Sequence, residues 1–517
     1  MQKKYLRSII ALTMAATMLG GCGSSEPDNS NDSNEEEELK LEDIVVEKSQ
    51  YSNPVAGFDA DGKVTYGGDP AALVDGDTVY LYTGHDTAAT EQYVIPEYQC
   101  YSTKDMINWT YEGVVLTMKD VTWADNNSAW ASQVAKYGDK YYLYFCSWDS
   151  TSEGKQSIGV AVSDSPTGPF KDIGEPLVRG TFTTEESSGW NDIDPTIWIE
   201  TDDQGVEHRY LMWGNGKLFI CELNEDMISV KDTTGDGKIV YREDVRELRA
   251  PESFTEAPWL YRRRDENGKC YGPYYVFYAQ GWRERMSYAR TDSFDGLVFW
   301  EPGDILMNPS VTSNTNHPSV IDFKGKTYFI YHNGSVDGGS GFRRVACIEE
   351  ITFNDDGTID YIQESAAGIA GTVSVIKNND GDAISHVKFI NSSADNAYPY
   401  MNVEVGIGKS EDELDAEWVI VQGKADKSNE NYVSIISNNK AGLYLTESDG
   451  KIVLAQNANG KLTEQQTFKT LKGLNGEGVT FESIVTPGQY ITCGEDGSLT
   501  LTDGSDRDAC SFVIETK

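Results

Sequence analysis

Short apolar segments separated by polar turns recur through the first 380 residues, and apolar positions with helical spacing are scarce. In each unit a polar or acidic residue precedes an apolar strand, a turn such as VDGD or FKGK follows, and an aromatic-rich strand returns. The units begin at Asp69, Trp130, Asp194, Glu256 and His317. Five such units predict an all-β fold, with a five-bladed β-propeller over residues 49–378.

The period of the pattern changes beyond residue 380. Two series of residues recur there every 46 positions. They are Val387, Val433 and Val479, which begin apolar strands, and Tyr398, Tyr444 and Tyr490. Three strand-rich repeats of this length predict a β-trefoil over residues 383–517. The Gly-, Asn- and Asp-rich stretch KNNDGDA, which starts at Lys377, is expected to separate it from the propeller.

The first 22 residues combine a basic start, a short apolar run and the sequence LGGC. The run is too short to span a membrane. The pattern resembles a bacterial lipoprotein signal peptide, with cleavage before Cys22 and a lipid on that thiol; an ordinary signal peptide is the alternative. Residues 23–48 are acidic and poor in core-forming side chains, which predicts a disordered tether. The protein is therefore expected to be lipid-anchored on the outer side of a bacterial membrane.

The composition supports a strand-rich fold and limits the partners. Tyr (29), Phe (17) and Trp (11) are plentiful, as is typical of sheets. A formal charge of −40 excludes nucleic acid and anionic membrane surfaces, which it would repel, but not a neutral polysaccharide. Seven cysteines besides Cys22 contain no CxxC pair, so we predict buried thiols; only Cys493 and Cys510 are considered as a disulfide. The seven are Cys100, Cys146, Cys221, Cys270, Cys347, Cys493 and Cys510.

The propeller would bring together residues that are far apart in the sequence. The first residues of the inner strands reach the same end of the central channel, so four of them are expected to converge. They are Asp69, Asp194, Glu256 and His317. A carboxylate that begins one strand is commonly a turn residue, but three at matching repeat positions indicate a shared site.

Such carboxyl groups suit the cleavage of glycosidic bonds. That reaction needs a protonated carboxyl at the leaving oxygen and an ionised one that activates water, about 6.5–9.5 Å apart in inverting enzymes. Glu256 lies in TEAPWLYRRR, and enclosure by Pro258, Trp259 and Tyr261, with an ionised Asp194 nearby, predicts a raised pKa. Asp69 follows two glycines, which predicts a carboxylate open to water and ionised.

At these positions the sequence resembles glycoside hydrolase family 43, whose members are five-bladed propellers acting on polysaccharides that contain arabinose and xylose. The matching pieces are GGDPAALVDGDTVYLYTGHD, NDIDPTIWI, FTEAPWLYRR, NHPSVI and GFRRVACIEEITFNDDGTI, within about residues 50–375. The resemblance implies that Asp69 is the general base and Glu256 the general acid. It assigns to Asp194 the role of orienting the acid and tuning its pKa.

The same resemblance implies an arginine and a histidine in the site. Arg344 would contact substrate, with Arg343 as the alternative because the family's HRS is RRV here. His317 would be the family's channel histidine, often beside a bound calcium or its water. No organic cofactor is implied.

The segment KDTTGDGKIVYRE is a second candidate for a calcium site. Its oxygen-bearing side chains have the spacing of an EF-hand loop, but no flanking helices are apparent, and a hairpin insertion is the favoured interpretation. The positions concerned are Asp232, Thr234, Asp236, Gly237, Ile239 and Glu243.

Flat side chains are expected around the channel end, where a sugar would bind. Trp130, Trp190 and His332 lie in segments predicted to form the rim, with packing inside a blade as the alternative for each. His85 would either face the pocket or end a strand.

The C-terminal repeats resemble an arabinofuranose-binding module of carbohydrate-binding family 42, chiefly in VTFESIVTPGQYITCGEDGSLTLTDGSDRDACSF. The histidine of that family's YLRH motif is Glu447 in the second repeat and Cys493 in the third, while Asp508 matches a later aspartate. Sugar binding and a structural or docking role both remain open for this domain.

The resulting functional hypothesis is an exo-acting, inverting glycosidase that removes α-L-arabinofuranosyl groups from arabinoxylan or arabinan. A β-D-xylosidase of the same family is the nearest alternative, because the catalytic residues are shared. A surface glycan-binding lipoprotein with an inactive propeller is a third hypothesis, which the presence of all three carboxyls disfavours.

Overall fold

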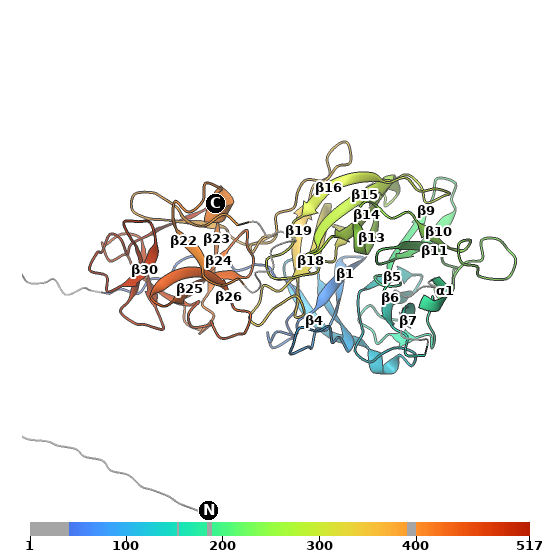
Figure 1. Ribbon diagram of the computed structural model, residues 1–517, viewed down its shortest axis with the longest axis horizontal. Coiled ribbons are helices and arrows are strands. Elements are labelled where there is room, and N and C mark those ends of the chain that lie inside the picture. Colours follow the sequence, from blue (N-terminus) through green and yellow to red (C-terminus); the bar gives the residue numbers. More distant parts are fainter. Residues whose placement is uncertain (1–40, 152–154, 184–188, 390–399) are drawn as a thin grey trace, which may run out of the picture. The chain divides into compact units, whose positions relative to one another are not determined.

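The computed structural model describes residues 41–151, 155–183, 189–389 and 400–517. Within these ranges the chain is all-β apart from short helical turns, namely η1 (Met118–Asp120), α1 (Gly180–Thr183) and η2 (Glu413–Ala416). The predicted fold class is confirmed: a five-bladed propeller is followed by a closed β-barrel domain (Figure 1).

Each of the five blades is an antiparallel sheet. Blade 1 contains β1 (Gly68–Asp75), β2 (Thr78–Gly84), β3 (Glu97–Thr103) and β4 (Trp109–Thr117). Blade 2 contains β5 (Ser132–Tyr137), β6 (Lys140–Trp148), β7 (Gln156–Ser163) and β8 (Lys171–Asp172). Blade 3 contains β9 (Thr196–Thr201), β10 (Glu207–Trp213), β11 (Leu218–Glu222) and β12 (Val245–Leu248). Blade 4 contains β13 (Phe254–Arg264), β14 (Cys270–Gln280), β15 (Arg285–Thr291) and β16 (Glu301–Met307). Blade 5 contains β17 (Ser319–Phe323), β18 (Lys326–Asn333) and β19 (Val345–Ile351).

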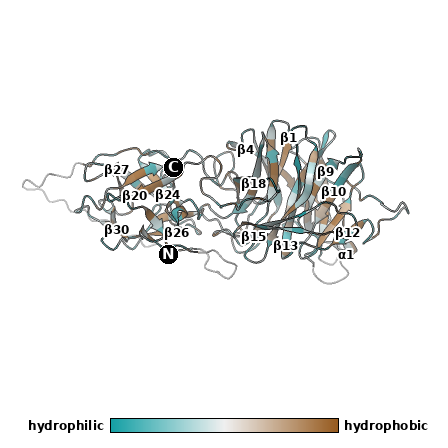
Figure 2. Ribbon diagram, turned by 90° about the horizontal axis from the view of Figure 1, so that it is seen from above, coloured by the Kyte–Doolittle hydropathy of each residue, from teal (hydrophilic) through white to brown (hydrophobic). Residues whose placement is uncertain are grey.

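The blades bury their apolar faces against one another. β6, with the sequence KYYLYFCSW, is buried at successive positions on both of its faces, because a neighbouring blade covers each face. Core clusters join residues of blades 1 and 2, of blades 2 and 3, and of blades 3 and 4, and a fourth cluster joins blades 4, 5 and 1. Figure 2 shows the resulting apolar strands inside the propeller. No blade could bury these faces alone, so the ring is the stable unit.

The first and last parts of the propeller meet in blade 5. Ala56 forms an antiparallel bridge with Ala346 on the free edge of β19, and Val55 N donates to Ala346 O at 2.8 Å. The side chain of Asn53 accepts from Ile348 N at 3.0 Å and donates to Ser365 O at 2.9 Å. A segment that precedes blade 1 therefore completes the last blade and closes the ring.

The C-terminal domain is built around a ring of paired strands. β24, β25, β26, β30, β29, β28 and β27 pair in that order, and β27 pairs again with β24, so this barrel has no free edge. The strands are β20 (Ser374–Lys377), β21 (Ile384–His386), β22 (Val403–Ile407), β23 (Trp418–Gln422), β24 (Tyr432–Ser437), β25 (Leu443–Ser448), β26 (Lys451–Gln456), β27 (Phe468–Lys472), β28 (Val479–Ser483), β29 (Tyr490–Cys493), β30 (Leu499–Thr502) and β31 (Val513–Thr516). The β-trefoil itself stays a prediction, and Tyr398 of its repeat lies outside the described residues.

Two predicted connecting segments are structured, and both predictions were wrong in part. The end of the predicted tether packs on the C-terminal domain, where Ile44 N donates to Thr470 O at 3.2 Å and Ile44 and Val46 contact its core. Alternating apolar residues in LEDIVVEK supply this contact despite the acidic composition. The stretch from Lys377, predicted to separate the two domains, lies inside the C-terminal domain. It is a turn between β20 and β21, in which Lys377 pairs with Ala383. The rest of the tether and Cys22 lie outside the described residues.

The polar loop between β11 and β12 has no flanking helices, as expected for a hairpin insertion. Asp232 accepts backbone N–H bonds from Thr234, Gly235 and Gly237, which satisfies its carboxylate within the loop. All seven described cysteines are free thiols, including Cys493 and Cys510, and five of them are buried.

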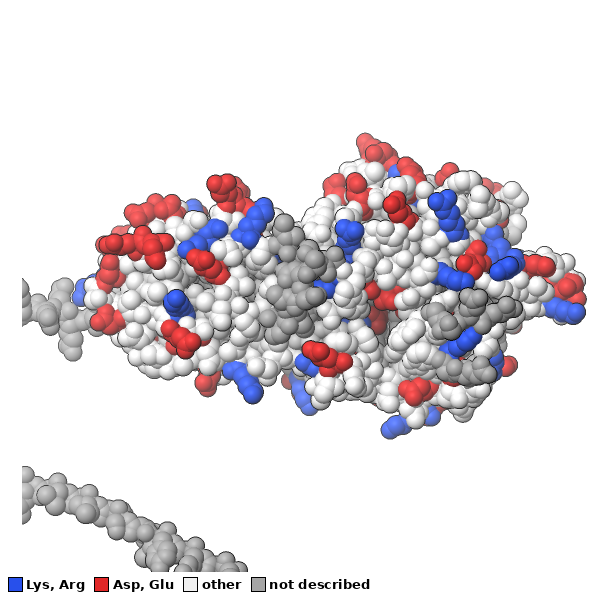
Figure 3. Space-filling model, viewed as in Figure 1, with Lys and Arg blue, Asp and Glu red and all other residues white. Residues whose placement is uncertain are grey.

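The described chain shows no helix both long and apolar enough to cross a membrane. Figure 3 shows Asp and Glu side chains spread over one face, with Lys and Arg between them and no continuous basic surface there.

Candidate active site

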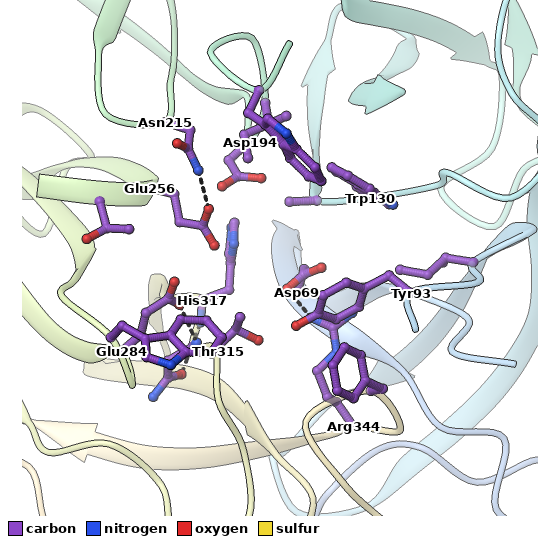
Figure 4. Close-up of a pocket in the computed structure, with 18 residues that line it drawn as sticks. Asp69, Tyr93, Trp130, Asp194, Asn215, Glu256, Glu284, Thr315, His317 and Arg344 are labelled. Atoms are coloured by element: carbon purple, nitrogen blue, oxygen red, sulfur yellow. Dashed lines mark hydrogen bonds and ion pairs between the residues drawn. The ribbon is translucent and has the colours of Figure 1, made fainter. Parts of the chain in front are cut away.

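The predicted carboxyls meet in a cavity of about 350 Å³. Asp69, Asp194, Glu256 and His317 all line it, together with residues of each of the five blades (Figure 4). The geometric prediction is therefore confirmed: the first residues of the inner strands reach one site. Trp130 and Trp190 line the same cavity.

A buried arginine holds Asp69. Arg344 Nη1 donates to Asp69 Oδ1 at 2.7 Å, and the same guanidinium makes two 2.9 Å bonds to Asp86. Gly68 leaves room for this group, because a Cβ there would lie 2.0 Å from Arg344 Cζ. Burial raises the pKa of Asp69, and the Arg344 guanidinium, followed by His332 and His317, lowers it. The net shift is downward, so Asp69 is ionised at neutral pH.

Replacing Asp86 with asparagine should destabilise the protein. Breaking a buried ion pair by removing one partner typically costs about 3–5 kcal/mol, and Asp86 is only 1% exposed. Urea unfolding should show a lower midpoint and a correspondingly lower free energy of unfolding. Asp77→Asn, the same change in an exposed pair with Lys104, is the control and should leave the midpoint unchanged. Equal midpoints for both variants would show that Asp86 does not anchor Arg344.

Glu256 lies across the cavity from Asp69 (Figure 4). Asn215 Nδ2 donates to Glu256 Oε2 at 2.5 Å, and the Glu284 carboxyl lies within hydrogen-bonding reach of the Glu256 carboxyl. Burial raises the pKa of Glu256, the bond from Glu284 lowers it, and the Asp69 charge raises it, so the net shift is upward. The predicted direction is therefore confirmed.

The groups that enclose Glu256 differ from those predicted. Trp259 Nε1 donates to Val320 O and Tyr261 OH donates to Asp322, so both side chains belong to the core between blades 4 and 5. Side chains alternate along a strand, so sequence neighbours do not share the environment of Glu256. Asp194 accepts from Ala257 N at 2.9 Å, and burial followed by the Glu256 carboxyl raises its own pKa well above the usual value. An ionised Asp194 is therefore not the source of the Glu256 shift.

Backbone strain marks these strand starts. Asp69 and Asp194 have φ angles of 53° and 61°, and Ala257, next to Glu256, has 57°. Non-glycine residues rarely adopt this left-handed conformation, which costs about 1–3 kcal/mol where the surroundings enforce it. The strained residue is the carboxyl residue itself in blades 1 and 3 and the residue after it in blade 4, so the fold holds all three strand starts against a local preference.

Aromatic rings form part of the wall and rim. Trp130 and Trp190 stack with centroids 5.0 Å apart, and Trp148 packs edge-on against both. Trp190 is 46% exposed and Trp282 is 58% exposed. Both present flat apolar surface where a sugar ring could pack.

The predictions for His332 and His85 have different outcomes. His332 is fully buried and does not line the cavity: its Nδ1 accepts from Asp69 N at 3.1 Å and its Nε2 donates to Thr315 O at 3.0 Å. The predicted substrate contact is therefore wrong, and His332 instead fixes the backbone of Asp69. His85 bonds Glu97 at 2.8 Å and ends a strand.

The structure bears on the predicted arginine of the site and on the calcium predicted beside His317. Arg344 lines the cavity, whereas Arg343 donates to Gly338 O, so the structure favours Arg344. No group of three or more His, Cys, Asp or Glu side chains within the described ranges is placed to hold a metal ion. His317 would need backbone oxygens or water as further ligands, so these side chains alone do not form a calcium site, and the calcium stays a prediction.

Several cavity residues were missed in the sequence. Asn215 and Glu284 follow the second strands of blades 3 and 4, and the arginine anchor Asp86 follows that of blade 1. In an antiparallel hairpin the end of the second strand lies beside the start of the first. The sequences TGHD, MWGN and QGWRE, at the ends of the second strands of blades 1, 3 and 4, could therefore have indicated these three residues. The other missed lining residues are Tyr93, Ile95, Ala131, Ile193, Thr255, Trp282, Thr315, Asn316 and Phe342.

In the C-terminal domain, the positions compared with sugar-binding residues are engaged within the barrel. Glu447 accepts from Ser483 and Thr486, and Asp508 accepts from Asn475 Nδ2 at 2.9 Å. Neither observation assigns a sugar site there.

A five-bladed propeller with carboxyls from separate blades around one small cavity is the arrangement expected of a glycoside hydrolase. The chain belongs to Glycosyl hydrolases family 43, whose profile matches residues 53–359. A second profile, the Alpha-L-arabinofuranosidase B (ABFB) domain, matches residues 387–512.

Two curated relatives and one solved structure illustrate the similarity. Beta-D-galactofuranosidase xynD of Aspergillus niger is 32% identical, covering 59% of this chain and 84% of that protein. Xylosidase/arabinosidase 43A of Humicola insolens is 30% identical, covering 57% and 96%. A solved β-xylosidase/α-arabinofuranosidase from a compost microbial metagenome, in complex with xylotriose, has a TM-score of 0.48 at 28% identity, covering 61% of this chain and 98% of that chain.

Proposed function

We propose that the protein is an inverting, exo-acting glycoside hydrolase that releases α-L-arabinofuranosyl residues from plant polysaccharides such as arabinoxylan or arabinan. The observation that carries the proposal is the cavity, in which Asp69 and Glu256 face each other with opposite pKa shifts. A volume of about 350 Å³ lies near the lower end of the roughly 300–1,000 Å³ typical of small-ligand pockets. It suits one terminal sugar better than an internal stretch of chain.

In the proposed mechanism each carboxyl handles one proton. Asp69 takes a proton from water as the water oxygen attacks the anomeric carbon, and Glu256 gives its proton to the departing glycosidic oxygen. The bond between that oxygen and the anomeric carbon breaks, and the configuration inverts. Arg344 keeps Asp69 ionised, and Asp194 positions the backbone after Glu256. Trp190 and Trp282 support the polymer at the mouth of the cavity.

A domain match and a relative both support the preference for a furanose sugar. The ABFB domain match and the galactofuranosidase relative both carry furanose specificity in their names. α-L-Arabinofuranose and β-D-galactofuranose share the ring configuration and differ by one exocyclic carbon. A β-D-xylosidase is the second candidate, favoured by relatives named xylosidase/arabinosidase.

Aryl glycosides test the sugar directly. Purified protein should release 4-nitrophenol from the α-L-arabinofuranoside faster than from the β-D-galactofuranoside or the β-D-xylopyranoside. Proton NMR of the first-formed sugar should show inversion. Faster hydrolysis of the xyloside would replace the first candidate by the second, and release from none of them would oppose both.

The sugar partner and the location are proposed together. We propose that Cys22 carries a lipid, so that the enzyme stays at the outer side of a bacterial membrane beside its polysaccharide. Cys22→Ser should move the activity from the membrane fraction to the soluble fraction of expressing cells. Equal membrane association of both proteins would contradict the anchor.

A further inference from the structure

A fourth carboxyl group, that of Glu284, lies in the cavity beside Glu256 (Figure 4). Glu284 directly precedes β15 in blade 4 and is 2% exposed. None of the roles proposed above uses it. A buried carboxyl in contact with the acid acts either as a hydrogen-bond donor or as a like charge, and the two states shift the pKa of the acid in opposite directions.

Backbone contacts fix the Glu284 carboxyl. Its own N–H donates to Asn314 O at 3.0 Å, and Asn316 N–H donates to Glu284 Oε2 at 2.8 Å. The preceding Arg283 donates from Nε to Ser313 O at 3.2 Å. The loop before β17 in blade 5 therefore holds this turn of blade 4 and leaves one Glu284 oxygen for Glu256.

The bond between the two carboxyls requires a proton. An ionised carboxylate only accepts hydrogen bonds, so Glu256 and Glu284 are bonded only when at least one is protonated. On Glu284, Oε2 already accepts from Asn316, as the carbonyl oxygen of a neutral carboxyl would. Burial and then the Glu256 carboxyl raise the pKa of Glu284 well above its usual value, which supports the same assignment.

The charged groups around the pair also favour a neutral Glu284. Asp69 faces it from blade 1 as an ionised carboxylate, whereas Asp194 on blade 3 has a raised pKa and adds no negative charge. Arg344 is the one Lys or Arg among the described residues that line the cavity, and its guanidinium already pairs with Asp69. Burial lowers the pKa of His317 to about 4, so that ring is neutral.

We propose that Glu284 is a positioning residue for the general acid: it stays protonated and donates its O–H to Glu256. This bond orients Glu256 and stabilises the carboxylate that Glu256 becomes when its own proton moves to the leaving oxygen. The proton of Glu284 stays in place throughout. The inference rests on the proposed role of Glu256 as the general acid.

Two substitutions at Glu284 show whether its carboxyl acts on Glu256 as a hydrogen-bond donor or as a negative charge. In Glu284→Gln the amide can donate to Glu256 while its oxygen still accepts from Asn316, so kcat should stay within about threefold. Glu284→Leu has a similar volume but no donor. It should lower kcat on 4-methoxyphenyl α-L-arabinofuranoside on the order of 10–100-fold, because a bond to a charged group is lost. On the 2,4-dinitrophenyl glycoside, whose leaving group needs no proton, the loss should be much smaller.

The pH profile gives a readout that a purely structural role would not move. The bond from Glu284 lowers the pKa of Glu256, so its removal in Glu284→Leu should raise that pKa and move the basic limb of kcat/KM to higher pH. Glu284→Gln should leave the limb in place. A basic limb shifted to lower pH in Glu284→Gln would show an ionised Glu284 and overturn the proposal. Equal losses on both glycosides with unmoved limbs would reduce Glu284 to a structural role and overturn it too.

Glu256→Gln distinguishes this failure from failure of the proposed function. Suppose that Glu256→Gln loses activity only on substrates whose leaving group needs a proton, whereas the activity of Glu284→Leu does not depend on the leaving group. Only the inference about Glu284 is then wrong. If Glu256→Gln shows no dependence on the leaving group, the acid assignment itself is wrong. Circular dichroism and thermal unfolding of each variant confirm that the compared proteins are folded.

Discussion

Glu256→Gln should lower kcat/KM on arabinoxylan oligosaccharides about 10²–10⁴-fold, the usual contribution of a positioned general acid. Glutamine keeps the shape of the side chain and can still accept from Asn215, so the cavity should persist. What is lost is the proton for the leaving oxygen, an alkoxide that is too basic to depart alone. The loss should therefore grow as the leaving group becomes more basic.

A series of aryl arabinofuranosides measures this dependence. The 2,4-dinitrophenyl glycoside should be hydrolysed by Glu256→Gln at a rate close to that of the unmodified enzyme. Glu266→Gln, the same change at an exposed position of the β13–β14 turn, is the control and should behave as the unmodified enzyme on every substrate. An equal loss across the series would assign Glu256 a role other than proton donation.

Asp69→Asn should lower kcat on every substrate, whatever the leaving group, near the upper end of the roughly 10²–10⁴-fold range for acid–base catalysis. Attack by water requires a base whether the substrate carries a good or a poor leaving group. The side chain is 14% exposed and ionised beside Arg344, and asparagine cannot take the proton. Arg344 keeps Asp86 as a partner, so the variant should fold.

Added azide tests the assignment of Asp69 further. Azide is an anionic nucleophile without a proton to lose, so it should restore turnover of the 2,4-dinitrophenyl glycoside and give a glycosyl azide of inverted configuration. Asp61→Asn, at an exposed position before β1, is the control and should show neither the loss nor the rescue. If the loss in Asp69→Asn depended on the leaving group, Asp69 would be the general acid and Glu256 the general base.

The sequence predicted the parts of the site that recur with the blades. Asp69, Asp194 and Glu256 stand at matching positions of the repeat, and the geometry of a propeller converts matching positions into one place in space. The ionised state of Asp69 was also predicted, although the cause is Arg344, 275 residues away, rather than openness to water.

The parts that were not predicted depend on contacts without a fixed spacing. Asn215 and Glu284 follow second strands whose endings differ in length and composition, so the repeat does not align them. His332 was predicted from its aromatic ring, but its position in the strand points the ring into the blade, where Asp69 N occupies one nitrogen. Residues 41–48 pack through Ile44 and Val46, two apolar residues in a segment whose overall composition is acidic.

Ring closure by the segment around Ala56 determines when a newly made chain can act. That segment is synthesised before blade 1, yet its partner Ala346 belongs to the last blade. Asp69, Asp194 and Glu256 come from three different blades, so a chain that lacks its later blades has no complete site. Contacts of such long sequence separation carry a large loop-closure cost and slow the folding of the ring. Catalytic ability therefore arises together with the final blade.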